Sequence, residues 1–256
     1  MNQAAFVWGR RAAADPAAVE AIIAPARQLA AGHTLSTSLD EMIERRAVFL
    51  TAYQNGTYAL QYRARVAAVV AAERAAVPGG SGLAEAAARY LFKLMAVKDE
   101  YEVARLYTDG TFLKQVNAAF EGDLKFQFHL APPIFGRKGA DGQPKKTSFG
   151  PWMMKAFGVL AKLKGLRGTP FDIFGYSAER RVERGLMVDY AALLDELCSK
   201  LTPANHSLAI ALASIPEKIR GYGHVKARHI AAAKAEEADL LADWRAGGNG
   251  VRMAAE

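Results

Sequence analysis

Two stretches of the chain gather ionisable side chains at spacings suited to binding a ligand or a partner. The first, RYLFKLMAVKDEYEVARLYTDG at residues 89–110, sets charges of both signs beside an apolar stripe that predicts a single helix. Its candidate contact residues are Lys93, Lys98, Asp99, Glu100 and Arg105. Lys98 and Glu102 lie four residues apart. The same charges can therefore also form weak pairs on a solvated helix, worth about 0.3 kcal/mol each.

The second stretch, IRGYGHVKARH, has residues suited to binding an anion. Its candidate contacts are Arg220, Tyr222, His224 and Lys226. The glycines at 221 and 223 let the backbone approach a ligand, and a helix starting here points free N–H groups at it. The alternative is a turn between two helices that needs glycine for positive φ.

Arginines further along the chain can extend that anion-binding surface. They are Arg167, in LRGTPFD, and the pair Arg180 and Arg181. Arginines at helix starts also pair with acids such as Glu179 and Glu183, and we favour this structural role.

No residue is predicted to be catalytic or to bind a metal. His129 alternates outward from an apolar strand, where it is either a proton-transfer group or a polar residue on a solvated face. His224 and His229 are five residues apart, off the i,i+4 face that two metal-binding histidines use. The chain has no GxGxxG after a strand, no GxxxxGKS or GxxxxGKT, no HExxH and no paired CxxC.

The single cysteine, Cys198, has the spacing of a core thiol beside Leu194 and Leu201. One cysteine cannot hold an iron-sulfur cluster, which needs about four thiolates. Any such centre would therefore belong to another polypeptide or to another part of a longer chain.

Composition predicts a globular chain with a basic surface segment. The 256 residues are 51% hydrophobic and carry a net charge of +7. Residues 125–167 hold nine Lys and Arg against one acid, Asp141. Such a segment can face a phosphorylated cofactor or an acidic partner. Nucleic acid is the least supported partner, because no helix-turn-helix, RNP or zinc-finger pattern is present.

No membrane partner is expected, because no stretch approaches the roughly 18 uninterrupted apolar residues of a membrane span. The N-terminus, MNQAAFVWGRR, lacks the basic-then-apolar order of a secretory signal. We therefore expect a cytoplasmic location.

The elements that must position these residues are mostly helical. We predict a mainly α fold of about eight helices, with a small β-hairpin or short sheet near 124–150, where apolar and polar residues alternate. PGGSG at 78–82 is the best boundary candidate. It separates an N-terminal helical segment, 1–77, from a main helical domain with the β insertion, 83–245, and a disordered tail, 246–256. The two helical parts can also pack as one domain.

Several helix ends have recognisable capping residues. Asp15-Pro16 opens a helix that Gly32 closes, and Ser38 with Glu41 forms a capping box for a helix that ends at Asn55-Gly56. Further on, Ser177 caps a helix reaching about residue 200.

Five longer strings go beyond such general patterns. They are NQAAFVWGR, RYLFKLMAVKDEYEVARLYTDG, FEGDLKFQFHLAPP, FGPWMMKAFGVLAKLKGLRGTPFDIFGYSAERRVER and IPEKIRGYGHVK. Together and in this order they closely resemble the C-terminal region of the fused indolepyruvate ferredoxin oxidoreductases, in the 2-oxoacid:ferredoxin oxidoreductase family. The resemblance is spread over nearly the whole chain.

This resemblance implies an enzyme that oxidatively decarboxylates aryl 2-oxoacids to acyl-CoA and passes electrons to ferredoxin. That family uses thiamine diphosphate, Mg, CoA and iron-sulfur (4Fe-4S) clusters. The thiamine-binding and cluster-binding parts lie N-terminal to the region resembled, and this chain has neither motif. We therefore expect it to bind none of these cofactors alone and to be inactive by itself.

Two functions follow as hypotheses. The first is a C-terminal accessory domain of such an oxidoreductase, whose partners are the thiamine-binding and cluster-binding domains or subunits, with ferredoxin as a further candidate. The second is a stand-alone α-helical binding module for a phosphorylated ligand or an acidic protein.

Overall fold

The computed structural model describes residues 3–30, 35–130 and 147–247, and these divide into two compact units. The first unit spans Met1–Thr37 and contains α1 (Gln3–Ala14) and α2 (Pro16–Ala30). The Asp15 carboxylate accepts a hydrogen bond from the Ala18 N–H at 3.0 Å, and Pro16 is the first residue of α2. The predicted start at Asp15-Pro16 is confirmed. The predicted end at Gly32 lies outside the described residues.

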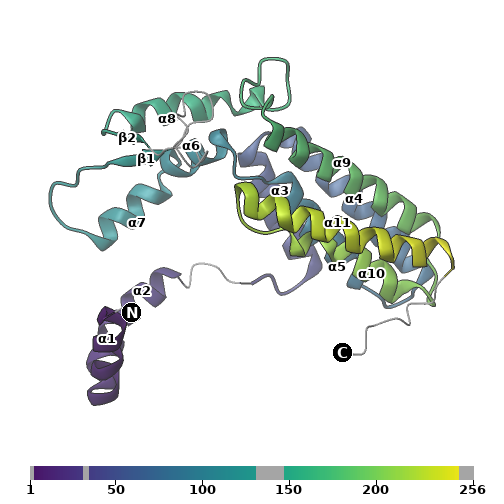
Figure 1. Cartoon of the computed structure of the whole chain (residues 1–256), viewed down its shortest axis with the longest axis horizontal. Coiled ribbons are helices and arrows are strands. Elements are labelled where there is room, and N and C mark those ends of the chain that lie inside the picture. Colours follow the sequence, from purple (N-terminus) through teal and green to yellow (C-terminus); the bar gives the residue numbers. More distant parts are fainter. Residues whose placement is uncertain (1–2, 31–34, 131–146, 248–256) are drawn as a thin grey trace. The chain divides into compact units, whose positions relative to one another are not determined.

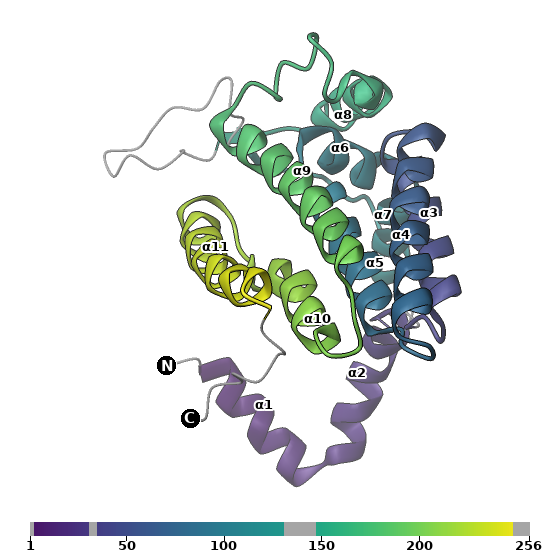
Figure 2. The ribbon, with the colours of Figure 1, turned by 90° about the vertical axis from the view of Figure 1, so that its right-hand side faces the viewer.

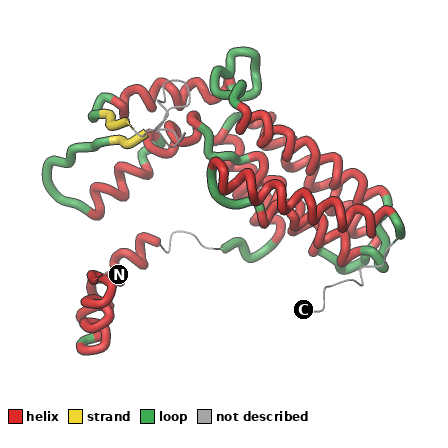
Figure 3. Tube along the Cα trace, in the orientation of Figure 1, coloured by secondary structure: helices red, strands yellow, loops and turns green. Residues whose placement is uncertain are grey.

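The second unit, Ser38–Glu256, holds the remaining described elements (Figures 1 and 3). In chain order they are α3 (Leu39–Tyr53), α4 (Gly56–Ala76), α5 (Gly82–Met95), α6 (Glu100–Thr108), α7 (Thr111–Ala119), β1 (Phe128–Leu130), β2 (Thr147–Phe149), α8 (Met153–Lys162), the 3-10 helix η1 (Leu163–Leu166), α9 (Ala178–Ser199), α10 (His206–Ser214), the 3-10 helix η2 (Ile215–Lys218) and α11 (Gly223–Arg245).

The mainly α prediction is confirmed. Across the described ranges there are eleven α-helices and one two-stranded antiparallel sheet. The sheet pairs Phe128 with Phe149 and Leu130 with Thr147, inside the region where a hairpin was expected. The loop GRKGADGQPKK lies outside the described residues, as does the tail from residue 248. No helix in the described ranges has the length and apolarity that crossing a bilayer requires.

The main core surrounds α5. Figure 2 shows α3, α4, α5 and α9 running side by side, with α10 and α11 beside them. Most of α5 is buried, including Leu83, Tyr90, Leu91 and Leu94, while Glu85, Arg89 and Lys93 form a narrower polar stripe. Such a wide apolar face has to be covered by several neighbouring helices. Cys198, on α9, packs against this core as a half-buried side chain, as its spacing predicted.

A smaller core lies between α6, α8 and the hairpin. Its buried members are Ala104, Phe128, Met153 and Phe157. The Tyr107 ring lies 5.3 Å from both the Phe128 and Phe157 rings, centroid to centroid. Aromatic packing therefore anchors the hairpin on α6 and α8.

Capping explains where several helices begin. The Ser38 hydroxyl accepts from the Glu41 N–H at 3.2 Å, and the Ser177 hydroxyl accepts from the Arg180 N–H at 3.3 Å, which confirms both predicted caps. The predicted helix end at Asn55-Gly56 is confirmed in position, because α3 ends at Tyr53 with Gln54 as its C-cap, but Asn55 itself caps the next helix. The Asn55 side chain accepts from the Tyr58 N–H at 2.9 Å and so begins α4, directly after α3 has ended.

The start of α5 is capped by another helix. Glu73 of α4 is 1% exposed, and its two carboxylate oxygens accept from the N–H groups of Leu83 and Ala84, each at 2.8 Å. The Nε2 atom of His206, at the start of α10, lies 2.6 Å from the same carboxylate. The predicted boundary at 78–82 falls at the connection between α4 and α5, residues 77–81, and helices on both sides of it share the main core.

The prediction of one helix over residues 89–110 is wrong. The stretch contains the end of α5 and the whole of α6, separated by residues 96–99. Asp99 has extended backbone and accepts from the Glu102 N–H at 2.8 Å, so it caps a new helix. Lys98 is thus outside any helix, and the suggested Lys98–Glu102 pair does not form. Glu102 instead pairs with Arg105 at 2.7 Å.

Candidate functional site

The break at residues 96–99 is held open by two tyrosines from neighbouring helices. Tyr53, the last residue of α3, donates its hydroxyl to the Val97 carbonyl at 3.1 Å. Tyr58, in the first turn of α4, donates to the Met95 carbonyl at 3.0 Å. The Tyr58 bond satisfies a carbonyl of the last residue of α5, which has no helical partner, and the Tyr53 bond adds to the Asp99 N–H bond at the Val97 carbonyl. Burial raises the pKa of Tyr58 to about 12, so this donor is neutral at physiological pH.

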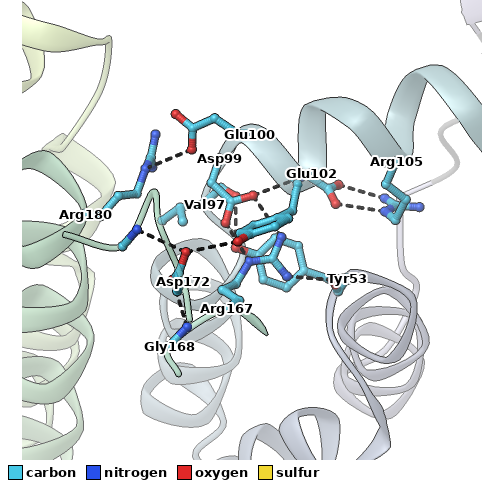
Figure 4. Close-up of polar contacts among 12 residues, drawn as sticks. Tyr53, Val97, Asp99, Glu100, Glu102, Arg105, Arg167, Gly168, Asp172 and Arg180 are labelled. Carbon is cyan, nitrogen blue, oxygen red and sulfur yellow. Dashed lines mark hydrogen bonds and ion pairs between the residues drawn. The ribbon is translucent and has the colours of Figure 1, made fainter. Parts of the chain in front are cut away.

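A buried ion pair connects this break to the segment after η1 (Figure 4). Arg167 donates to Asp99 through two nitrogens, Nε at 2.6 Å and Nη2 at 2.8 Å, and its Nη1 donates to the Tyr53 carbonyl at 2.7 Å. The guanidinium also lies 3.8 Å from the centre of the Tyr53 ring. Burial by itself would lower the Arg167 pKa, but the Asp99 hydrogen bonds together with the nearby Tyr53, Asp99 and Glu102 groups outweigh it, and the pKa is raised.

Asp172 organises the loop of residues 167–177. This carboxylate is 4% exposed and accepts from the N–H groups of Gly168 at 2.9 Å and Gly175 at 3.0 Å, and from the Tyr101 hydroxyl at 3.3 Å (Figure 4). A Cβ at residue 175 would collide with the carboxylate, so glycine is required there. Phe174 packs edge-on against Tyr101 at 5.3 Å between centroids.

The same loop turns three large apolar side chains outward. Phe171 is 74% exposed, Ile173 61% and Tyr176 58%. The Tyr176 hydroxyl donates to the Pro170 carbonyl at 2.8 Å, which closes the loop on itself. The loop therefore has a fixed inner face and an apolar outer face.

A cavity of about 150 Å³ lies beside the break, and we call it the paired cavity because its charged side chains bond to other groups of the protein. Its lining includes Tyr53, Tyr58, Asp99, Arg167, Asp172, Arg180, Glu183 and Met187. Glu183, on α9, contacts both Arg180 and Lys226. The Arg180 Nε lies 3.7 Å from a Glu100 oxygen, and burial raises the Glu100 pKa. This arrangement stabilises the fold more readily than it captures a ligand.

A second cavity, of about 320 Å³, lies next to the first and shares Leu94, Val97 and Glu183 with it. Four cationic side chains line it, so we call it the cationic cavity. They are Lys93, Lys98, Arg220 and Lys226. Tyr222, 72% exposed, also lines it.

The structure thus gathers five predicted candidates from both sequence stretches, Lys93, Lys98, Arg220, Tyr222 and Lys226, in the cationic cavity. Asp99 and Arg167 line the paired cavity instead. Arg167 belongs to a buried ion pair, as the structural reading favoured, and is not part of an open basic surface.

The remaining candidates lie elsewhere. Arg105 pairs with Glu102 on α6, and Glu100 lies beside Arg180. His129 is exposed on the hairpin, with its Nδ1 3.0 Å from the Ser148 hydroxyl. His224 is exposed in the first turn of α11 and does not line the cationic cavity.

Sequence reasoning missed Tyr53 and Asp172, which hold the site together. The sequence does contain a signal for Asp172. It is a single acid between Phe171 and Ile173, with glycines at 168 and 175, and this pattern fits a loop built around a buried carboxylate. In the described ranges no three His, Cys, Asp or Glu side chains gather as a metal site would require.

Comparison with known proteins identifies a family but not an activity. No curated protein and no solved structure matches the chain. The sequence profile of a family of unknown function, DUF6537, matches residues 39–239, a range that includes both cavities and the 167–177 loop. The chain belongs to this family, DUF6537.

Proposed function

We propose that this chain is a C-terminal accessory domain of a thiamine-diphosphate-dependent indolepyruvate:ferredoxin oxidoreductase, and that it docks on the catalytic parts of that enzyme. The resemblance of five ordered strings supports the choice of enzyme. The 167–177 loop is the observation that carries the docking role, since it is braced from inside while Phe171, Ile173 and Tyr176 face solvent.

Exposure of these three apolar side chains to water is unfavourable, which favours a partner that covers them. Large apolar side chains that gather on one exposed segment are typical of interaction surfaces, and aromatic side chains contribute most to binding there. A loop already fixed by Asp172 loses little conformational entropy when a partner covers it. The proposed occupant is the thiamine-binding part of the same enzyme.

The iron-sulfur clusters of that enzyme do not fit this chain. Cys198 is the only cysteine, and it packs half-buried against the main core, so it cannot supply the roughly four thiolates of a cluster. The sequence also lacks the thiamine-binding motif, which in the resembled family lies N-terminal to this region. Carbon chemistry and electron transfer are therefore assigned to the partner parts, and this chain alone is inactive in the proposal.

Some cations of the basic segment 125–167, which suggested ferredoxin docking, bind other groups of this protein. Arg167 is buried against Asp99, and Lys164 donates to the Ala52 carbonyl. Lys125, Lys155 and Lys162 remain exposed among the described residues. Docking of an acidic ferredoxin thus has less support than docking through the loop.

Co-purification with the thiamine-bearing part tests the proposal. We expect a stable complex, and we expect Phe171→Asp to weaken it by about tenfold or more because a charge replaces an apolar anchor. Leu60→Asp is the matched control, since Leu60 is 64% exposed on α4 and is not part of the loop. Indolepyruvate-dependent reduction of a dye should fall when the chain is omitted. Unchanged activity together with no complex would overturn the proposal.

A further inference from the structure

The cationic cavity contains hydrogen-bond donors that the fold does not use. Lys98 makes no hydrogen bond or ion pair with any residue in the described part of the chain. Arg220 has only exposed contacts within its own turn, at 3.1 Å to the Glu217 carbonyl and 3.3 Å to the Glu217 carboxylate. In the paired cavity, by contrast, Arg167 uses all three nitrogens.

We propose that the cationic cavity is a binding site for the phosphate group of a small phosphate monoester or diphosphate. Lys98 and Arg220 contact the phosphate, and Lys93 and Lys226 supply the surrounding positive charge. Nothing in this proposal depends on the accessory role, because the site lies wholly within this chain.

The charge balance of the cavity favours an anion. Among the described residues, four cations line it and Glu183 is the only acid that does so. Glu183 contacts Arg180 as well as Lys226, so its charge is shared with a cation outside the cavity. Glu217, beside Arg220, is the other acid close by. The cations still exceed the acids, and a dianion would relieve their repulsion.

Lys93 is held at the cavity by two backbone carbonyls. Its Nζ donates to the carbonyls of Pro216 at 2.8 Å and Glu217 at 3.1 Å, which fixes the ammonium at the cavity. Burial lowers the Lys93 pKa, and the neighbouring charge of Arg220 lowers it further. A phosphate bound nearby would act in the opposite direction.

The backbone at one wall suits an anion as well. The cavity is lined by Gly221 and Tyr222, and α11 begins directly after them at Gly223. Both glycines have positive φ, 86° at Gly221 and 54° at Gly223, as the turn interpretation required. The positive end of a 23-residue helix therefore lies at the edge of the cavity.

The remaining lining indicates the body of the ligand. Leu94, Val97, Leu186 and Ile219 provide apolar surface, and the exposed Tyr222 ring offers a face for stacking. A volume of about 320 Å³ is at the low end of small-molecule sites. A compact aryl or alkyl phosphate fits this description. A monocarboxylate would neutralise only one of the clustered cations, so phosphate is the favoured anion.

Isothermal titration calorimetry of the whole chain with phenyl phosphate and with inorganic pyrophosphate tests the site. We expect both to bind, and we expect Lys98→Ala and Arg220→Ala each to raise Kd by about tenfold, the loss of one charge-assisted contact. Arg228→Ala and Lys155→Ala are matched controls, because both residues are exposed and neither lines the cavity. Both should bind like the unaltered chain.

Three results would overturn the proposal. The first is no heat of binding from either probe at millimolar concentration. The second is a Kd that changes as much in the Arg228→Ala control as in Arg220→Ala. The third is phenylacetate binding as tightly as phenyl phosphate, since a carboxylate site would then describe the cavity better. Failure of the complex with the thiamine-bearing part leaves all three readouts unaffected.

Discussion

Replacement of Arg167 by alanine should destabilise the protein strongly. The side chain is 12% exposed and its partner Asp99 is 5% exposed, so the pair is shielded from solvent. Removing the guanidinium leaves a buried carboxylate whose described partner is the Glu102 N–H. It also removes the bond to the Tyr53 carbonyl and the contact with the Tyr53 ring.

The expected cost is about 3–5 kcal/mol in the free energy of unfolding, the range for breaking a buried pair by removing one partner. Asp99→Asn should cost less, because asparagine still caps α6 and keeps one acceptor for Arg167. The double variant should be more stable than the sum of the two single effects predicts, by about 2 kcal/mol or more, because no unpaired charge remains.

Urea unfolding followed by circular dichroism at the helix band measures these differences. Arg181→Ala is the matched control, because Arg181 is exposed near the start of α9 and should change stability by less than about 0.5 kcal/mol. If Arg167→Ala proves so unstable that no folded baseline is seen, Arg167→Lys retains the charge but not the bidentate geometry and gives a smaller measurable loss. A cost below about 1 kcal/mol for Arg167→Ala would refute the reasoning, since the pair would then behave like an exposed one.

Three further predictions concern other buried polar groups. Asp172→Ala should release the 167–177 loop and speed its cleavage in limited proteolysis, whereas cleavage at an unchanged rate would show that other contacts hold the loop. Glu73→Gln should cost about 1–3 kcal/mol by urea unfolding, because an amide has one oxygen for two backbone N–H groups, and a neutral effect would contradict that count. Burial raises the Tyr58 pKa from 10.0 to about 12, so its stabilising contribution is complete below pH 10 and is lost as the pH rises through 12. Tyr58→Phe should therefore flatten the stability profile in that window, and Tyr222→Phe, at a 72% exposed position, is the control that should not.

Local signals were enough to predict much of the fold. The caps at Asp15, Ser38 and Ser177 act within three residues of themselves, so they were readable from the sequence alone. The hairpin was readable because alternation has a period of two and depends on neighbouring residues. The cap at Asn55 shows the limit of such signals, because an asparagine between two helices fits the end of one as well as the start of the next.

The break at residues 96–99 was not predictable in the same way. Apolar periodicity continues through it, and Asp99 reads as an ordinary charged position of a helix. Tyr53, Tyr58 and Arg167 stabilise the break. Arg167 is 68 residues away in sequence from its partner Asp99. A local pattern carries no information about partners at that separation.

The residues of the cationic cavity were predicted as candidates, but their meeting in one cavity was not. Lys93 and Lys98 belong to one stretch, and Arg220 and Lys226 to another, and each stretch was recognisable by its charges. Only the packing of α5 with η2, and of η2 with α11, brings them together. For Arg167 the structural role was favoured over a ligand-binding surface, and the structure pairs it with Asp99, a partner that its sequence neighbourhood did not indicate.

The capping of α5 by Glu73 also limits how the protein can be divided for experiments. A fragment that starts at residue 83 would keep the apolar α5 but lose the carboxylate that binds its first N–H groups. A fragment that stops at residue 77 would keep a carboxylate whose described partners, Leu83, Ala84 and His206, are all missing. The smallest piece that preserves this contact runs from α4 through α10, so shortened versions of the chain should be cut outside that range.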